Sequence, residues 1–307
     1  MFGESALQLM AINALLGLSI YLTLACGQLS LANAAFMGLG AYVGASLTLN
    51  AGWPFWATVL AAIVAPMLLA VLIGLPALRL RGVFLAIATI GLGEVLRVVV
   101  VNLRATGGAE GISSIPVLTR NWHLALALLA AIFLTWRLRG SRMGYAFEAI
   151  REDETAARTM GIDTTRYKLI AFVLGAALAG LAGVLKAHLF RTISPADYGF
   201  VLAVDILTFA VVGGSTSFVG PILGAVLLTA LPELLRSNLL RGVANVQVGW
   251  QTLLLNGVIL LLVILFLPNG LISLVNWRWR RRLPGTPDMT GGGLAQTAGG
   301  DVGTAAR

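Results

Sequence analysis

The sequence is poor in the residues that form cross-links and metal centres. Its 307 residues include one cysteine, Cys26, and two histidines, His123 and His188. A single cysteine excludes an intrachain disulfide and any metal site made of several thiolates. The histidines lie far apart, near the ends of apolar segments. We therefore predict that both are interfacial and that neither belongs to a metal or catalytic site.

Charged residues are also scarce. They make up 11% of the chain, against 58% hydrophobic residues and a mean hydropathy of +0.89. Soluble domains contain about 25% charged residues, so this chain is predicted to be a polytopic membrane protein in contact with lipid. The net charge of +8 includes no basic stripe interleaved with aromatic residues, which argues against nucleic-acid binding. A G-x-x-x-x-G-K-[ST] phosphate loop is absent too, so ATP binding through that motif is not expected.

Long apolar runs fill most of the sequence. A spanning helix needs about 20 apolar residues, and the runs predict an all-α transmembrane bundle of about eight or nine spans within residues 1–282. Residues 283–307 are rich in Gly, Thr and Pro and are predicted to form a disordered cytoplasmic tail. The candidate spans are Ala6–Cys26, Gly27–Leu49, Pro54–Leu78, Gly82–Asn102, Trp122–Trp136, Leu169–Leu189, Phe200–Val212, Phe218–Leu235 and Thr252–Leu267.

The main polar interruption is Arg137–Lys168. Its density of Arg and Lys predicts a cytoplasmic loop. Alternate crossings from this loop place Gly213–Ser217 on the cytoplasmic side and both Asn102–Asn121 and Arg191–Gly199 outside. The basic segment Trp277–Arg282 is also expected on the cytoplasmic side.

Within the loop, Gly144–Gly161 is predicted to form one amphipathic helix. The segment contains no proline, Glu154 and Arg158 are spaced for an i,i+4 pair, and Gly161 stands where a helix would end. The residues expected on its apolar face are Tyr145, Ala149, Ile150, Ala156, Ala157 and Met160.

Two interpretations of this helix remain open. It lies on lipid headgroups or serves as a solvated connector, or it docks a soluble partner. Its polar face mixes acidic and basic residues, which favours docking. The candidate docking residues are Glu148, Arg151, Glu152, Arg158 and Gly161.

Polar side chains occur in the small-residue run Gly27–Gly44. Small residues allow close helix packing, whereas polar side chains within a span find partners or line a cavity. The composition of this run therefore fits both a closely packed helix and a broken helix along a transport pathway. Gln28, Ser30 and Asn33 are therefore candidate pathway residues.

Charged side chains also occur within spans. Glu94 and Arg97 are spaced i,i+3, which predicts either an internal ion pair or a site for substrate or gating. Asp205 could pair with Arg97 or Lys186, or bind a cation. Ser217 lies in a predicted turn that ends at Pro221, in the first turn of the next helix. Glu94, Arg97, Asp205 and Ser217 complete the candidate pathway residues.

Several segments resemble, in order, the motifs of LivM-type branched-chain amino acid permeases of ABC importers. Gly27–Tyr42 is similar to G-Q-x-S-L-x-x-A-x-F-x-G-x-G-A-Y, and Phe84–Arg97 to F-L-A-I-A-T-x-G-x-G-E-x-x-R. Thr106–Ile112 matches T-G-G-x-x-G-I, whose glycines imply a tight outer loop. Glu148–Ile162 matches E-A-I-R-E-D-E-x-A-A-R-x-x-G-I. Gly213–Ala225 follows G-G-x-G-S-x-x-G-P-x-x-G-A, except that Thr216 or Ser215 stands where glycine is usual.

The resemblance implies an ABC importer permease that forms half of a translocation pathway in the bacterial cytoplasmic membrane. It implies a second related permease chain, two ATPase subunits and a periplasmic substrate-binding protein as partners. The Glu148–Ile162 motif would sit on the ATPase. The chain would not be an enzyme and would bind no cofactor, because ATP and Mg²⁺ belong to the partner subunits.

Other functions remain as alternatives. A urea or amide permease of the same family fits the same motifs, and sugar permeases resemble it more distantly. A secondary amino acid transporter coupled to protons or sodium through Glu94 or Asp205 would need no ATPase. A membrane enzyme is disfavoured because no catalytic constellation can be proposed.

Overall fold

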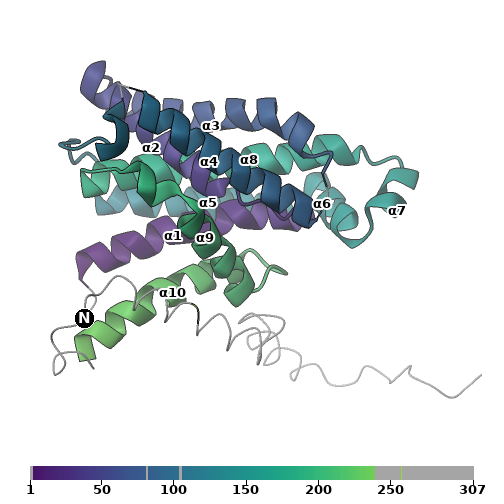
Figure 1. The fold of residues 1–307 in the computed structure, drawn as a ribbon. Coiled ribbons are helices and arrows are strands. Elements are labelled where there is room, and N and C mark those ends of the chain that lie inside the picture. Colours follow the sequence, from purple (N-terminus) through teal and green to yellow (C-terminus); the bar gives the residue numbers. More distant parts are fainter. Residues whose placement is uncertain (1–2, 81, 104–105, 239–256, 258–307) are drawn as a thin grey trace, which may run out of the picture. The chain divides into compact units, whose positions relative to one another are not determined.

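A computed structural model describes residues 3–80, 82–103, 106–238 and 257. This part of the chain is helical apart from connecting segments and one isolated bridge between Ile112 and Ile193, which confirms the all-α class (Figure 1). Two short 3-10 turns are present, η2 (Gly108–Glu110) and η3 (Pro195–Tyr198). The α-helices are α1 (Glu4–Ala25), α2 (Asn33–Asn50), α3 (Phe55–Ala77), α4 (Val83–Asn102), α5 (Asn121–Arg139), α6 (Arg142–Glu152), α7 (Glu154–Thr159), α8 (Thr164–Phe190), α9 (Phe200–Gly213) and α10 (Val219–Asn238).

Six segments of the described chain are long and apolar enough to cross a membrane. They are α1, α3, α4, α5, α8 and the stretch Pro195–Gly213 that contains α9. This confirms a polytopic membrane protein. The predicted span Thr252–Leu267, the basic segment Trp277–Arg282 and the tail 283–307 lie outside the described residues, so the total of eight or nine spans stays a prediction.

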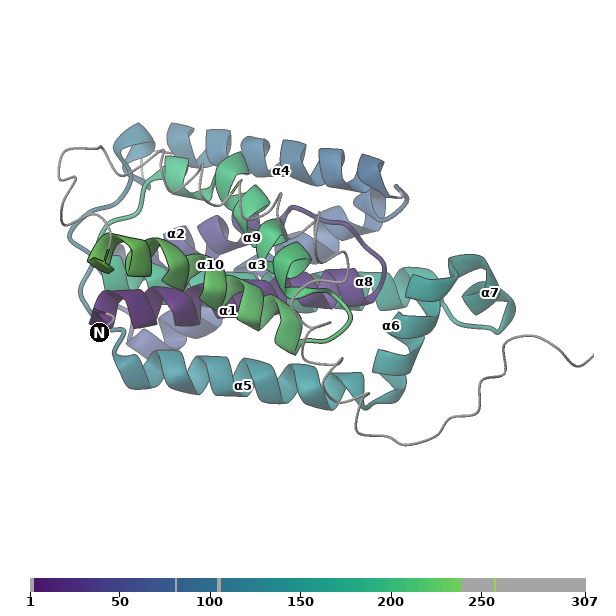
Figure 2. The same cartoon turned by 90° about the horizontal axis from the view of Figure 1, so that it is seen from below.

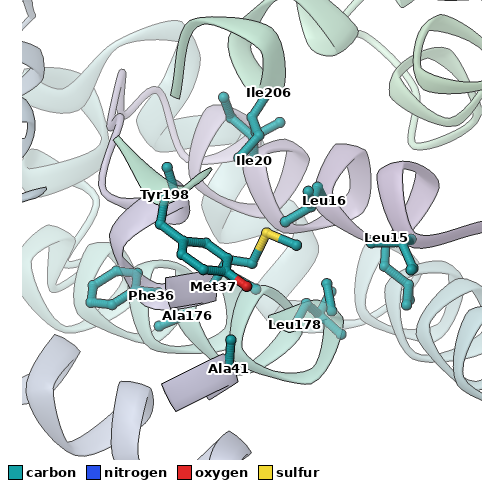
Figure 3. Packing of buried hydrophobic residues seen from close by; sticks show 14 of the residues in the cluster. Leu15, Leu16, Ile20, Phe36, Met37, Ala41, Ala176, Leu178, Tyr198 and Ile206 are labelled. Carbon is teal, nitrogen blue, oxygen red and sulfur yellow. The ribbon is translucent and has the colours of Figure 1, made fainter. Parts of the chain in front are cut away.

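Helix α8 is the centre of the bundle and packs most extensively against α2, α3 and α1. Small residues bring these helices close together. A Cβ atom on Gly40 would lie 2.5 Å from the Cα of Gly180, which only a glycine permits. The buried side chains of α1, α2, α8 and α9 converge on one core (Figure 3). This core also contains an edge-to-face pair of Phe36 and Phe172, whose ring centroids are 5.3 Å apart.

Two of the crossings are interrupted by non-helical segments. After α1 ends, Gly27 takes a positive φ of 71° and the chain turns back into the bundle before α2 begins. The Asn33 amide bonds Ser19 Oγ at 2.7 Å, so α2 starts level with Ser19, about 9 Å before the end of α1. The predicted span Gly27–Leu49 is therefore wrong in its first part, because Leu31 N–H bonds the Thr89 hydroxyl instead of a helical carbonyl.

The second interruption precedes α9. After α8 ends, Arg191–Gly199 turns back, anchored by the reciprocal bonds between Ile112 and Ile193. Helix α9 then begins beside Glu94 and Arg97 of α4. We call Gly27–Ala32 the first re-entrant segment and Arg191–Gly199 the second.

Contacts divide the loops between two ends of the bundle. One end carries α6, α7 and the turn between α9 and α10, where Arg139 bonds Ser217. Figure 2 shows α6 and α7 extending beyond the end of α5. The other end carries η2, the second re-entrant segment and the bond between Gln8 and Asn121. The predicted alternation of loops is thus confirmed, as is the tight glycine loop around η2, where Gly107, Gly108 and Gly111 all have positive φ.

Candidate functional site

The polar loop forms two helices, which corrects the prediction of one. Asp153 ends α6 and caps α7, because its Oδ1 accepts hydrogen bonds from the amides of Thr155 at 2.7 Å and Ala156 at 3.1 Å. An aspartate that accepts from the following amides adopts extended backbone and so interrupts the preceding helix. The predicted stop is confirmed, since Gly161 has φ of 83° just after α7.

The break changes which side chains are buried. Tyr145 is 67% exposed and Met160 is 83% exposed, so the residues of the predicted apolar face do not all pack inward. The side chains that pack inward form a small cluster between the end of α1, α6, α7 and α8, and are those of Cys26, Phe147, Ile150, Ala157 and Ala171. The α6–α7 unit is thus fixed to the bundle by apolar contacts and presents Tyr145 and Met160 outward.

Helix α7 is held against α8 by ionic bonds. Glu154 accepts from Arg158 at 2.7 Å, from Lys168 at 2.8 Å and from the Thr164 hydroxyl at 3.3 Å. Arg158 Nε also donates to Thr164 at 2.9 Å. The predicted i,i+4 pair is therefore present, and Arg158 has a bonding role within the chain.

The remaining candidate docking residues differ in placement. Glu148, Glu152 and Gly161 are exposed. Arg151 is partly buried, and its Cα lies 3.2 Å from the position of a Cβ on Gly27, so α6 touches the first re-entrant segment at its start. Asp153 was not identified as a cap from the sequence, and Tyr145 and Met160 were assigned to the apolar face and not to the docking residues. For Asp153 the available signal was an Asp followed by Glu-Thr-Ala, a common helix start.

A cavity lies between α1, α5 and α6 at this end of the bundle. Its empty volume is about 430 Å³ including its open mouth. Ser217 lies nearby, with its hydroxyl 3.4 Å from Arg139 Nη1. The residues that give the cavity its polar character are Tyr21, Arg139, Glu148, Arg151 and Thr216.

Hydrogen bonds hold the first re-entrant segment and the start of α2 that follows it. The Asn33 amide donates to Ser19 Oγ, and Ser19 donates to the Gly175 carbonyl at 2.8 Å. Ser30 Oγ accepts from the amide of Ala32 at 3.3 Å. Gln28 differs, since its buried side-chain amide makes no hydrogen bond of ordinary geometry within the described residues.

The charged pair of α4 forms as predicted. Arg97 Nε lies 2.7 Å from Glu94 Oε2, and the side chains are 41% and 42% exposed. Asp205 pairs with neither Arg97 nor Lys186 in the part of the chain that is described, so those two options are wrong. Lys186 instead lies over the ring of Tyr198, 5.3 Å from its centroid.

The two histidines pack on the same aromatic ring. Phe55 lies 4.7 Å from His123 and 5.7 Å from His188, measured between ring centroids. His188 is buried among the helices in the last turn of α8 and bonds Thr48 at 3.0 Å and the Val184 carbonyl at 2.9 Å, and the interfacial position of both histidines stays a prediction. Among the described residues, no three His, Cys, Asp or Glu side chains are grouped to hold a metal ion.

A helical membrane bundle with two interrupted crossings and a polar helical pair at one end has the architecture of a membrane transport protein. A family profile described as the permease component of branched-chain amino acid transport systems matches residues 4–267. The chain therefore belongs to this family, whose members are transport permeases of ABC systems and not enzymes.

Similarity to individual proteins supports the same family. The chain is 33% identical over 294 residues to the high-affinity branched-chain amino acid transport system permease protein LivM of Salmonella typhimurium, covering 84% of this chain and 67% of that protein. LivM of Escherichia coli K12 gives the same identity and coverage. The high-affinity branched-chain amino acid transport system permease protein LivH of Escherichia coli K12 is 35% identical over 148 residues, which are 48% of this chain and 45% of LivH. Similarity to both permeases of a high-affinity system implies partner subunits. No solved structure matches the chain.

Proposed function

We propose that this chain forms half of the translocation pathway of an ATP-driven importer for branched-chain amino acids, and that an ATPase subunit docks on α6–α7. A second, related permease would supply the other half. Two ATPase subunits and a periplasmic binding protein would complete the complex. ATP and Mg²⁺ would be bound by the ATPase subunits, and this chain would bind no cofactor.

The observation that carries the docking proposal is the construction of α6–α7. The unit projects from one end of the bundle and exposes Tyr145, Glu148, Glu152 and Met160. An exposed Met and Tyr beside acidic side chains suit a protein partner better than bulk water. The unit is also attached firmly, through its apolar cluster and the bonds of Glu154.

Attachment of α6 to the bundle offers a route for coupling. Arg151 touches Gly27, where the first re-entrant segment begins, and that segment is bonded to α1 through the backbone amide of Gln28 and to α4 through the backbone amide of Leu31. Displacement of α6 by a partner would therefore move backbone inside the bundle. A partner drives such a change only if it binds one arrangement more tightly than the other.

The test is a triple variant, Glu148→Ala with Arg151→Ala and Glu152→Ala, in the complete complex reconstituted in proteoliposomes. We expect ATP hydrolysis to persist while ATP-driven leucine uptake falls, because the contact that links the two is weakened. Leu60→Ala is the control, since Leu60 is exposed on α3 about one turn from Trp56, which packs against Trp122 at the opposite end of the bundle. Unchanged uptake in the triple variant would overturn the docking proposal.

The same preparation separates the alternatives. Uptake that persists without ATP and collapses with an ionophore would indicate an ion-coupled transporter using Glu94 or Asp205. Uptake of urea in place of leucine would indicate the urea or amide permease.

A further inference from the structure

We infer that the groove between α2, α4 and η3 holds the amino acid in transit, with its charged head on Glu94 and Arg97 and its aliphatic side chain in the groove. This inference rests on the proposed function, because it names where the substrate of the import pathway binds. It is argued from four features of one small region.

The first feature is depth. Glu94 is the twelfth residue of α4, a helix of 20 residues, so the pair lies about midway along a crossing of roughly 30 Å. Helix α9 begins at the same level, beside the pair. Charged side chains halfway along a span are costly against lipid and therefore face a partner or a water-filled path.

The second feature is the ion pair itself. Arg97 and Glu94 present one cation and one anion 2.7 Å apart, and both remain partly exposed. A zwitterionic amino acid carries the same two charges at a similar separation. Its carboxylate can bind Arg97 and its ammonium group can bind Glu94, so that the internal pair is exchanged for two charge-assisted hydrogen bonds.

The third feature is the uncapped start of α9. Gly199 is the N-cap residue and offers no side-chain acceptor. The first helical bond is donated by Ala203 to the Gly199 carbonyl, so the amides of Phe200, Val201 and Leu202 have no acceptor among the described residues. Within a membrane such amides need an acceptor. Since a Cβ on Gly199 would lie 3.9 Å from Glu94 Oε1 and 4.0 Å from Arg97 Cδ, a carboxylate on Arg97 would be close to them.

The fourth feature is the groove, whose empty volume is about 340 Å³ including its open mouth. Its walls are mostly apolar and come from Ala35, Gly38, Leu39, Gly93, Leu96 and Val100. Tyr42 and Tyr198 also line it, are 3% and 5% exposed, and have hydroxyl groups without a hydrogen-bond partner in the described chain. Unpartnered buried hydroxyl groups are expected where a ligand or water completes the site.

Other charges near the groove are already engaged. Lys186 lies over the ring of Tyr198, and Asp197 accepts from the amide of Ser194 at 3.1 Å. Among the charged side chains of the described residues, Arg97 is the one that lines the groove itself, and Glu94 is its ion-pair partner. Urea has neither a carboxylate nor an aliphatic chain, so this combination selects an aliphatic amino acid.

The size of the groove gives the first test. A Cβ on Gly93 would lie 3.7 Å from the Cβ of Ala35, an ordinary contact, so Gly93→Ala is tolerated and Gly93→Leu fills the groove. We would measure ATP-driven uptake by the reconstituted complete complex, with binding protein preloaded with leucine or with valine. Because a single methylene in an apolar pocket changes discrimination by about tenfold or more, Gly93→Leu should lower the leucine-to-valine uptake ratio about tenfold, with a smaller shift for Gly93→Ala.

Gly91→Leu is the matched control, since Gly91 lies on the same helix outside the groove with nothing within 4 Å of its Cβ position. It should leave the uptake ratio unchanged. Co-purification of the partner subunits verifies that each variant assembles. An assembled Gly93→Ala or Gly93→Leu complex with a wild-type ratio would overturn the inference.

The charges give the second test. Arg97→Gln should lower leucine uptake by about tenfold, the cost of losing a hydrogen bond to a charged group. The exchange Glu94→Arg with Arg97→Glu restores an ion pair but reverses its direction relative to α9, so uptake should stay low. Restoration of uptake by the exchange would show that the pair is structural. Failure of the unmodified complex to import leucine with ATP would instead overturn the proposed function.

Discussion

The two re-entrant segments enter the bundle from opposite ends and differ in the groups that surround them. In the first, the backbone amides of Leu31 and Ala32 are satisfied by Thr89 and Ser30, and Asn33 is bonded to Ser19. In the second, the start of α9 is uncapped and lies beside an ion pair and a groove. The start of α2 also lacks a side-chain cap, and the Gln28 side chain of the first segment has no hydrogen-bond partner within the described residues, so the two segments differ in the ion pair and the groove that lie beside the second one. We therefore assign transmission of movement to the first segment and contact with substrate to the second.

The largest effect on stability is expected at Asn33. Asn33→Ala leaves Ser19 with one partner fewer inside the bundle, and a lost buried hydrogen bond costs about 1–3 kcal/mol. The unfolding temperature of the purified chain in detergent should fall. Asn50→Ala is the control, because Asn50 is exposed at the end of α2 and should change the free energy of unfolding by less than about 0.5 kcal/mol. Equal effects at both positions would contradict the fixed character of the first segment.

The next effect is expected at Asp153, the cap between α6 and α7. Asp153→Ala removes an acceptor for two amides, a loss of about 1 kcal/mol in local helix stability. Hydrogen exchange in α7 should accelerate, and coupling of uptake to ATP hydrolysis should weaken. Asp153→Asn keeps a capping side chain and should behave close to wild type. If the alanine variant exchanges at the wild-type rate, Asp153 is not what holds α7.

Breaking the ion pair of α4 should lower the stability less than Asn33→Ala or Asp153→Ala does. Arg97→Gln removes the charge of one partner, but the glutamine amide can still donate a hydrogen bond to Glu94. The unfolding temperature should stay within a few degrees of wild type while leucine uptake falls. A large loss of stability with unchanged uptake would assign the pair to the scaffold.

The smallest perturbation uses Cys26 as a natural reporter. Its thiol is buried in the cluster formed with Phe147 and Ile150. We expect maleimide labelling of the native protein to be slow, and to become faster in Ile150→Val, because that change removes one methyl group from the contact between α6 and the end of α1. Rapid labelling of the unmodified protein would show that the cluster opens by itself.

Several features were predictable because they depend on local spacing. The spans, the pairs Glu94–Arg97 and Glu154–Arg158, the stop at Gly161 and the glycine loop around η2 follow from apolar runs, helical periodicity and backbone preference. The position of Pro221 in the first turn of α10 follows from the same kind of rule.

Other features depend on contacts between distant segments. The bond of Leu31 to Thr89 delays the start of α2, and no local pattern contains it. No local pattern predicts the contact between Gly199 and Glu94 or the packing of both histidines on Phe55 either. The helix break at Asp153 depends on a local interaction, the capping of the following amides by the Asp153 side chain. It was missed from the sequence because the apolar periodicity continues across the break. The roles of the docking and pathway residues stay predictions.

Photo-crosslinking at Met160 tests the docking proposal most directly. Met160 would be replaced by a benzophenone amino acid in the complete complex, with Trp56, exposed near the other end of the bundle, as the matched position. We predict that Met160 captures a subunit carrying a G-x-x-x-x-G-K-[ST] phosphate loop and that Trp56 does not. An intact, transporting complex in which Met160 captures no ATPase subunit would contradict the assignment of α6–α7 as its docking site.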